Sequence, residues 1–301
     1  MNTTFETLDF IVFAIYAIII LFFGLWVSRS KDGETKNAED YFLASKSLPW
    51  WAIGASLIAA NISAEQFIGM SGSGFAIGLA IASYEWMAAL TLIIVGKYFL
   101  PIFIKKEIYT IPEFVEKRFS SQLKTILAVF WIGLYVFVNI TSVLYLGGLA
   151  LQTILNIDLI YGIIGLAVFA AAYSLYGGLS AVAWTDIIQV VVLILGGLIT
   201  SYLALNTVSS GNGMIEGLKI LYEVIPEKFD MILDKSNPEY MSLPGISVLI
   251  GGMWVANLYY WGFNQYIIQR TLAAKSLKEA QNGILFAAGL KMILPLIIVI
   301  P

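Results

Sequence analysis

The sequence predicts an all-α integral membrane protein, and three observations support that fold class. Hydrophobic residues make up 59% of the 301 residues and charged residues only 12%, and the mean hydropathy is +0.84. Globular domains are typically about 45–50% apolar and about 25% charged, so this composition indicates a chain that lies in a bilayer. Apolar segments of about 20 residues recur along the chain, which is the helix length that spans a bilayer core. Lysine and arginine also gather in alternate loops between these segments.

Several function classes are excluded by the residues that the chain lacks. It contains no cysteine and no histidine, which removes disulfides, thiolate catalysis, zinc fingers, haem ligation by histidine and Ser-His triads. A net charge of −3 offers no basic face, so nucleic acid is not an expected partner. The apolar segments carry neither a Ser-Lys nor a paired-aspartate constellation, and we therefore expect a protein that is not an enzyme.

Eight apolar segments are expected to form the membrane-spanning helices. They cover residues 10–27, 48–70, 79–104, 125–151, 159–176, 181–205, 246–269 and 283–301. The first is not expected to be a cleaved signal peptide, because no basic region precedes it and no small-residue cleavage site follows it. We expect about seven full transmembrane helices, with the eighth cut at the C-terminal end of the chain.

Two shorter segments outside the spans are also expected to be helical. Residues 111–119 begin with Ile-Pro-Glu-Phe and are expected to lie at the membrane interface, with the proline in the first helical turn. Residues 207–244 form an acidic loop, in which residues 214–224 are expected to form an amphipathic helix.

The positions of the basic residues predict the orientation in the membrane. The loops between the first and second, third and fourth, and seventh and eighth segments carry 12 of the 17 lysines and arginines. The loop 207–244 carries only three, against six acidic residues. Because cytoplasmic loops are enriched in lysine and arginine, we expect a multi-pass protein of the cytoplasmic membrane whose N-terminus lies outside.

Two of the predicted spans are interrupted by polar residues and glycines. Residues 48–70 contain the polar run 61–66 at the depth of the bilayer core, and residues 246–269 contain Gly251-Gly252 and Asn257. Transporter helices that bind a substrate are often discontinuous, because an unwound turn exposes carbonyls that an intact helix would consume. The alternative is that both are continuous spans whose small residues serve helix packing.

Charged residues inside the spans are costly to bury, so each is a candidate functional group. Lys97 lies near the end of its span and is interpreted as structural, because its side chain can reach the interface. Asp186 is either an interfacial cap or a carboxylate on an ion path, and Glu65 either lines a cavity or pairs with another polar group. Glu85 and Lys291 would each cost several kcal/mol if they were buried alone.

A shared polar cavity for Glu85, Lys291, Gln66 and Asn257 would remove that cost. These residues supply a carboxylate, an ammonium group and two amides, which together can hydrogen-bond several hydroxyls at once. The set therefore favours a neutral polyol over an amino acid as the bound solute. The alternative is that Glu85 and Lys291 form a purely structural ion pair between two helices.

Several runs of the sequence resemble the sodium:solute symporter family. They are Tyr41-Phe42-Leu43-Ala44 with Leu48-Pro49-Trp50-Trp51, Ala59-Ala60-Asn61-Ile62-Ser63-Ala64-Glu65-Gln66, Tyr173-Ser174-Leu175-Tyr176-Gly177-Gly178-Leu179-Ser180-Ala181, and Asn257-Leu258-Tyr259-Tyr260-Trp261-Gly262-Phe263-Asn264-Gln265 with Gln269-Arg270. The last run is similar to the sugar-transporting members of the family. The likeness extends through essentially all of the chain, with a looser match over residues 207–244.

The resemblance implies the LeuT-type inverted-repeat transporter fold with an additional leading helix. On this basis residues 1–47 form the leading transmembrane helix and a cytoplasmic loop, and residues 48–206 form the first five-helix repeat. Residues 207–244 form an extracellular loop, and residues 245–301 begin the second inverted repeat. The resemblance also implies that the chain is incomplete, because the family continues for several more helices that complete the sodium and sugar sites. A piece of this kind is not expected to transport on its own.

The resemblance further implies roles for individual residues of the sugar site. Tyr260 would stack against the sugar as an inner gate, and Met70 and Tyr84 would contribute to an outer gate. A close sugar-binding relative has serine in place of Ala88, so this chain lacks one hydroxyl contact. The residues that correspond to the family's sugar ligands are Gln66, Glu85, Asn257 and Lys291.

The implied sodium site lies at the interruption of the span 48–70. The backbone carbonyls of Ala59 and Ile62 would bind the ion, together with groups beyond the end of the chain. Asp186 would lie near the exit path of the ion, to which we also assign Glu65 and Asn61.

The sequence therefore predicts Na⁺-coupled symport of a galactose- or glucose-like sugar by alternating access. Sodium is expected as the coupling ion, no cofactor is expected, and the expected partners are sodium, a small sugar and the lipid bilayer. Two alternatives stay open, namely Na⁺-coupled symport of another organic solute such as inositol, sialic acid or proline, and a transporter-like membrane sensor. The sensor would need a cytoplasmic output domain.

Overall fold

A computed structural model describes residues 6–29, 37–62, 64–243 and 245–301, apart from the side chains of Ala64 and Glu65. Within these ranges all regular secondary structure is helical, except for an isolated bridge between Leu48 and Ala274, so the predicted all-α fold class is confirmed. The α-helices are α1 (Thr7–Val27), α2 (Ala38–Leu43), α3 (Trp50–Asn61), α4 (Ala64–Ile77), α5 (Ser83–Ile94), α6 (Leu100–Lys105), α7 (Ile111–Arg118), α8 (Ser121–Leu134), α9 (Thr141–Leu155), α10 (Leu159–Val208), α11 (Met214–Val224), α12 (Gly245–Ile250), α13 (Gly252–Leu258), α14 (Gln265–Leu272) and α15 (Leu277–Val299). The 3₁₀ turns are η2 (Ala44–Lys46), η3 (Leu79–Ala82) and η6 (Pro226–Phe229), and the π-helical turns are η4 (Val95–Phe99), η5 (Tyr135–Ile140) and η7 (Tyr259–Phe263).

Six helical stretches in the described ranges are long and apolar enough to cross a membrane. One of them, α10, covers 50 residues and contains both spans expected at 159–176 and 181–205, which meet at a kink with no loop between them. The chain turns between them at Gly178, whose φ of +61° is a conformation that glycine adopts at little cost. The six stretches are Thr7–Val27, Leu79–Lys105, Ser121–Leu155, Leu159–Val208, Gly245–Phe263 and Leu277–Val299.

The span expected at residues 48–70 is interrupted as predicted. α3 ends at Asn61, and Ile62 has an extended backbone (φ −87°, ψ 101°) before α4 begins at Ala64. The two halves have 12 and 14 residues, so neither is long enough to cross a bilayer alone. α4 continues to Ile77, which lies beyond the expected end of the span at residue 70.

The span expected at residues 246–269 is interrupted at two points. Gly251 separates α12 from α13, and Asn264 has an extended backbone (φ −79°, ψ 121°) between η7 and α14. Both predicted interruptions are therefore confirmed, and the interpretation of these segments as continuous spans is wrong. Each interruption leaves the carbonyls of a last helical turn without partners inside the helix.

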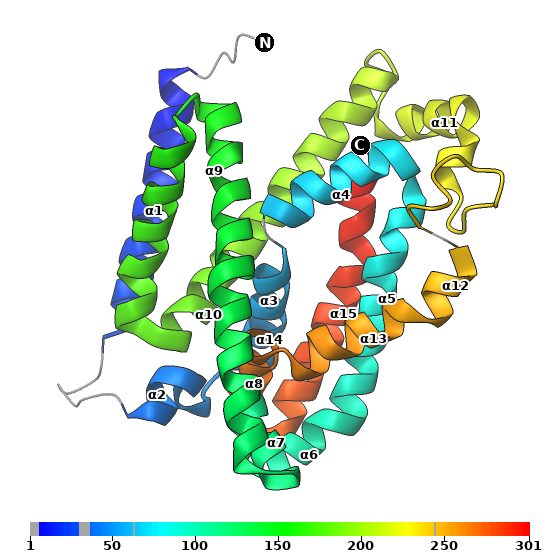
Figure 1. Ribbon diagram of the computed structural model, residues 1–301. Helices are drawn as coiled ribbons and strands as arrows, with labels where there is room; N and C mark the ends of the chain where they lie inside the picture. Colours follow the sequence, from blue (N-terminus) through cyan, green and yellow to red (C-terminus); the bar gives the residue numbers. More distant parts are fainter. Residues whose placement is uncertain (1–5, 30–36, 63, 244) are drawn as a thin grey trace.

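The helices pack around a central group formed by α3, α5 and α15. α15 packs against α3 and α5, and α10 packs against α1, α3 and α9 (Figure 1). The buried core comes largely from the central helices and from α14, and it includes Leu57, Leu92, Ile267 and Ile284. α1 and α8 instead expose most of their apolar side chains, as expected of helices that face lipid.

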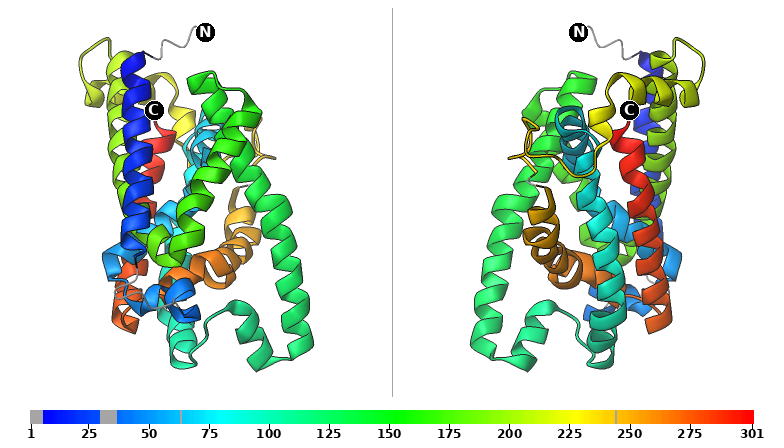
Figure 2. Two further views of the ribbon diagram at one scale, coloured as in Figure 1. Left: turned by 90° about the vertical axis from the view of Figure 1, so that its left-hand side faces the viewer. Right: turned by 90° about the vertical axis from the view of Figure 1, so that its right-hand side faces the viewer.

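The two ends of the helical bundle carry different segments. α1 begins and α15 ends at the end where α11 lies, whereas α6 and α7 lie at the opposite end (Figure 1 and Figure 2). This relative arrangement agrees with the one expected from the distribution of basic residues. The helices expected at residues 111–119 and 214–224 are present as α7 and α11. In α7, Pro112 lies in the first turn, and the side-chain oxygen of Thr110 accepts a 3.2 Å hydrogen bond from the N–H of Glu113.

A lysine in the segment between α11 and α12 caps the C-terminal end of α4. Lys228 Nζ donates hydrogen bonds of 3.0 and 2.5 Å to the carbonyl oxygens of Phe75 and Ala76 in the last turn of α4. A positive charge is favourable there, because the C-terminal end of a helix carries the negative end of its dipole. The contact helps to position the half of the interrupted helix that carries Gln66 and Met70.

Candidate functional site

A buried ion pair lies where α15 meets α5 and the interruption between α3 and α4. The ammonium group of Lys291 on α15, which is 0% exposed, pairs with the carboxylate of Glu85 on α5. It also donates a hydrogen bond to Oδ1 of Asn61 at the end of α3, and it lies 5.2 Å from the centre of the Trp261 ring. These contacts offset the cost of removing the two charges from water.

Gln66 extends this cluster onto α4. Its Nε2 donates a 2.7 Å hydrogen bond to Oε1 of Glu85 and lies 4.0 Å from the sulfur of Met70. Glu85 therefore accepts hydrogen bonds from Lys291 on one carboxylate oxygen and from Gln66 on the other. Three of the four predicted sugar ligands thus lie together, although they come from three different helices.

A first cavity, of about 320 Å³, opens beside this cluster. Glu85 and Asn257 face it from α5 and α13, and Tyr84 lies at its wall. The side-chain Nδ2 of Asn257 donates a 3.0 Å hydrogen bond to the carbonyl oxygen of Met253 in the same helix. The lining residues of the first cavity are Asn61, Tyr84, Glu85, Ala88, Ala256, Asn257, Tyr259, Tyr260 and Trp261.

A second cavity, of about 330 Å³, lies on the other side of Tyr260. Gln66 lines this second cavity and not the first, and Lys291 is enclosed by its contacts with Glu85 and Asn61. The expectation that all four predicted ligands share one cavity is therefore wrong in this structure, because the ammonium group binds protein oxygens. The lining residues of the second cavity are Ala60, Asn61, Gln66, Val138, Asn139, Ser142, Val143, Tyr260 and Tyr266.

Tyr260 lies between the two cavities, together with Asn61. Both residues line both cavities. The hydroxyl oxygen of Tyr260 accepts hydrogen bonds of 3.1 Å from Nδ2 of Asn61 and 2.9 Å from the hydroxyl of Tyr266. Its ring stands edge-on to Trp261, with ring centroids 5.0 Å apart. The ring that was predicted to stack against a sugar is thus held by hydrogen bonds at its hydroxyl end.

Some polar residues of the second cavity were not predicted as site residues. Asn139 of η5 and Ser142 of α9 lie at its wall, as does Tyr266 of α14. The sequence could have indicated Asn139 and Ser142, because they are polar residues three positions apart in an apolar span and therefore share one helix face. Tyr266 carried no comparable signal, since tyrosine is common near the ends of membrane helices.

The predicted sodium ligands lie at the interruption between α3 and α4. Ala59 is in the last turn of α3 and Ile62 follows its end, where backbone carbonyls lack partners within the helix. Unwound backbone carbonyls coordinate Na⁺ in some secondary transporters, and the assignment of Ala59 and Ile62 to a sodium site stays a prediction. The side chain of Glu65 lies outside the described residues, and its assignment to the ion path stays a prediction.

Asp186 lies in a second buried polar cluster. It is 6% exposed, it accepts a 2.5 Å hydrogen bond from the hydroxyl of Ser56, and its carboxylate lies 3.6 Å from Nη2 of Arg270. Arg270 also donates a 2.8 Å hydrogen bond to Ser56 and another to the carbonyl oxygen of Tyr266. The interpretation of Asp186 as an interfacial cap is therefore wrong, and its role on an ion path stays a prediction. Arg270, which was counted as a loop cation, is buried in α14.

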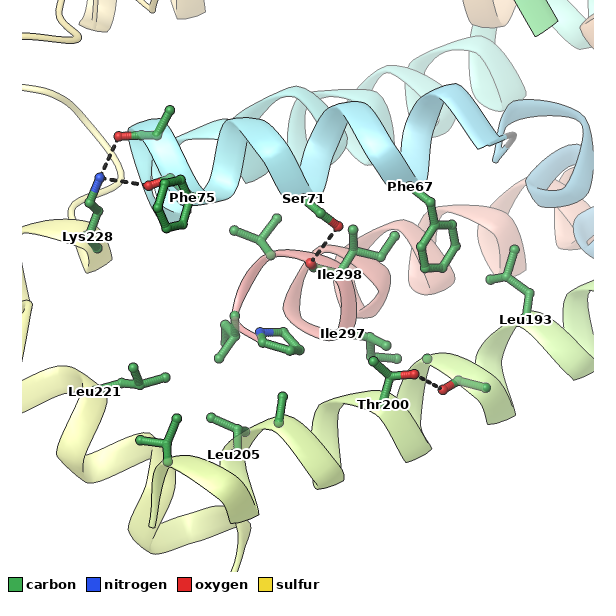
Figure 3. A pocket seen from close by; sticks show the side chains of 18 of the residues that line it. Phe67, Ser71, Phe75, Leu193, Thr200, Leu205, Leu221, Lys228, Ile297 and Ile298 are labelled. Atoms are coloured by element: carbon green, nitrogen blue, oxygen red, sulfur yellow. Dashed lines mark hydrogen bonds between the residues drawn. The ribbon is translucent and has the colours of Figure 1, made fainter. Parts of the chain in front are cut away.

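A third cavity, larger than the other two, is mostly apolar and lies apart from these groups. Its volume is about 1120 Å³, and Figure 3 shows side chains of α4, α10, α11 and α15 around it. Its two labelled hydroxyls are already bonded to backbone carbonyls, Ser71 to Ile298 at 3.4 Å and Thr200 to Gly196 at 2.9 Å. Because a sugar site needs several polar groups placed to bind hydroxyls, we do not assign the solute to this cavity.

The chain belongs to the sodium:solute symporter family. The model of this family matches residues 41–301. The family and the relatives described below are transporters and not enzymes.

Two curated relatives illustrate the likeness. The chain is 71% identical over 294 residues to a sodium/glucose cotransporter from Vibrio parahaemolyticus, a match that covers 98% of this chain and 54% of that protein. It is 35% identical over 312 residues to sodium/myo-inositol cotransporter 2 from Homo sapiens, which covers 97% of this chain and 44% of that protein. The chain therefore spans about half the length of the curated relatives that it matches.

A solved structure shows the same fold. It is that of a Na⁺-coupled sialic acid symporter in a substrate-bound outward-open state, with a TM-score of 0.83 and 24% sequence identity. The match covers 98% of this chain and 60% of that chain. At this level of identity the likeness concerns the fold alone, and it confirms the predicted LeuT-type fold.

Proposed function

We propose that this chain carries sugar- and sodium-binding residues of a Na⁺-coupled symporter for a galactose- or glucose-like sugar. The main support is the buried cluster of Gln66, Glu85 and Lys291, which lies beside a cavity at the interrupted helix. Ionisable groups deep in membrane helices are rare and mark the paths of solutes and ions. The 71% identity to a sodium/glucose cotransporter supports the same function.

A sugar in the first cavity would exchange hydrogen bonds with groups that now bind one another. Sugar hydroxyls both donate and accept, the Glu85 carboxylate accepts, and the Asn257 amide does both. When a hydroxyl takes the place of Gln66 on Glu85, the Gln66 amide becomes free to bind a second hydroxyl. Tyr260, which lines the same cavity, offers a flat ring to the C–H face of the sugar.

Na⁺ would bind to the carbonyls of Ala59 and Ile62, next to Asn61. Because Asn61 bonds both to Lys291 and to Tyr260, an ion that orders this turn also orders two residues of the sugar site. The entry of each Na⁺ would supply about 2.3 kcal/mol per 100 mV of membrane potential, before its concentration gradient is counted.

The membrane topology is part of the same proposal. Residues 48–206 would form the first repeat, residues 245–301 would begin the second, and the N-terminus would lie outside the cytoplasmic membrane. The interruptions after α3 and within the α12–α14 segment support this division, since matching interrupted helices are typical of inverted repeats.

Inositol is the second candidate solute. A sodium/myo-inositol cotransporter is among the relatives, and it is 35% identical to this chain. Ala88 lines the first cavity without a hydroxyl, at the position where a close sugar-binding relative has serine.

Uptake into proteoliposomes tests the proposal. The complete gene product is reconstituted, and the uptake of labelled galactose, glucose, myo-inositol and proline is measured with and without a Na⁺ gradient. We expect Na⁺-dependent accumulation of galactose or glucose. Accumulation of myo-inositol alone would favour the second candidate, and no Na⁺-dependent uptake of any of these solutes would contradict the proposal.

A further inference from the structure

The second cavity suits a neutral, hydrogen-bonding solute. Its volume of about 330 Å³ nearly equals that of the first cavity, about 320 Å³. At about 30 Å³ per water, it has room for on the order of ten waters, or for a solute in their place. Amides and hydroxyls line it, and none of its described lining side chains is charged.

Asn139 and Ser142 are polar side chains in a segment whose neighbouring residues are mostly apolar and exposed. In the part of the chain that the structure describes, neither side chain forms a hydrogen bond, and both line the second cavity. Their neighbours Val136, Phe137 and Ile140 are exposed apolar residues, as expected of a lipid-facing helix. A polar group in such a helix is costly unless it meets water or another polar group. Water or a solute in the second cavity can therefore hydrogen-bond to both side chains.

The helix backbone is irregular where Asn139 lies. Residues Tyr135–Ile140 form the π-helical turn η5 between α8 and α9. Such turns are rare in helices and frequently occur at functional sites. The hydroxyl of Tyr135, in the same turn, donates a 2.9 Å hydrogen bond to Oδ1 of Asn264 at the second interruption. The turn is thus tied to the interrupted helix that also carries Tyr260.

The two cavities share a wall. Asn61 and Tyr260 line both, and the 3.1 Å hydrogen bond between them lies at the boundary. Gln66 lines the second cavity while it donates a hydrogen bond to Glu85 at the first. A solute that leaves the first cavity past Tyr260 therefore enters the cavity lined by Asn139 and Ser142.

We propose that Asn139 and Ser142 form a second, transient binding site for the hydroxyl-rich solute. This inference rests on the proposed function, because it takes the first cavity as the primary sugar site. The amide and the hydroxyl each donate and accept, so together they can hold solute hydroxyls while Tyr260 moves. The second site lowers the barrier to passage and does not set the affinity of the first site.

The test uses the complete gene product in proteoliposomes, with galactose as the probe and a Na⁺ gradient as the driving force. Asn139→Leu replaces the amide by an apolar side chain with the same branching, and Ser142→Ala removes a single oxygen. Each is expected to lower the maximal uptake rate about fivefold, the effect of losing one hydrogen bond. The equilibrium affinity for galactose should change by less than about twofold. Asn139→Gln keeps an amide and should restore most of the rate.

Thr141→Val is the matched control, because Thr141 is an exposed neighbour that does not line the cavity. Unchanged uptake rates in Asn139→Leu and Ser142→Ala would overturn the proposal, as would an equal loss in Thr141→Val. An affinity loss that parallels the rate loss would also overturn it, since it would place both residues at the first site. If Asn139→Leu does not fold, Ser142→Ala decides alone. Absence of galactose binding in the unmodified protein would instead contradict the proposed function itself.

Discussion

The substitution Glu85→Gln, together with a double variant, tests whether the buried cluster stabilises the fold, binds the solute, or does both. The substitution keeps the shape of the side chain but removes the charge that pairs with Lys291, which is 0% exposed. Gln66 keeps an acceptor, because the new amide oxygen can still take its hydrogen bond. Removing one partner of a buried ion pair leaves the other charge uncompensated, and we therefore expect the free energy of unfolding to fall by about 3–5 kcal/mol.

The double variant Glu85→Gln/Lys291→Met removes both charges. Replacing a buried ion pair by uncharged groups of similar volume is often neutral or stabilising, so most of the lost stability should return. The sugar affinity should not return, because the Glu85 carboxylate that faces the first cavity is gone. We expect it to stay at least about tenfold below that of the unmodified protein, which corresponds to about 1.4 kcal/mol.

Two measurements on purified protein in detergent check this pair of variants. Denaturant unfolding followed by tryptophan fluorescence gives the stability, and equilibrium binding of labelled galactose in Na⁺ gives the affinity. Lys97→Met is the control, because Lys97 is an exposed lysine near the end of its span and should change neither quantity. Unmodified affinity in a well-folded double variant would refute the assignment of Glu85 and Lys291 to the sugar site. Unchanged stability in Glu85→Gln would refute the argument from burial.

Three further predictions test separate features of the structure. Tyr260→Ala should weaken galactose binding at least about tenfold by removing the ring face, whereas Tyr260→Phe should keep most of the affinity, and equal losses would contradict a stacking role. A Cβ at Gly283 would lie 2.8 Å from a side chain of α3, so Gly283→Ala should lower the free energy of unfolding by about 1–3 kcal/mol. Gly289→Ala has no atom within 4 Å of the added carbon and should not destabilise the protein, so similar losses would argue against close packing of α3 and α15. Cysteines placed at Lys235 and Lys275 should be labelled from opposite faces of the membrane, and labelling from one face would contradict the topology.

The spans and their interruptions could be predicted because each depends on local sequence. A polar run such as 61–66, or the pair Gly251-Gly252, weakens a helix whatever surrounds it. A lone charge in an apolar span needs a partner, and the sequence offered few candidates. The spans expected at 159–176 and 181–205 are also distinct within α10, because the chain turns at Gly178 between them.

The remaining contacts depend on how distant helices pack. Arg270 looks like a loop cation in the sequence, and only the packing of α14 against α3 brings it to Ser56 and to Asp186. Asn61 and Tyr260 are 199 positions apart, and no periodicity predicts that they bond. Asn139 and Ser142 share one helix face in the sequence, but the cavity that they line depends on how α3, α4 and α14 pack beside them.

Equilibrium binding of labelled galactose to the complete gene product most directly tests whether the cluster at the interrupted helix binds a sugar together with Na⁺. The measurement is made in Na⁺ and in K⁺, for the unmodified protein and for Gln66→Ala. We predict saturable binding that is at least about fivefold tighter in Na⁺, as expected of coupled sites. We also predict that Gln66→Ala weakens it at least about tenfold, because Glu85 loses a partner and the sugar loses an amide. Binding that is equal in the two ions, or unaffected by Gln66→Ala in a well-folded protein, would contradict this assignment.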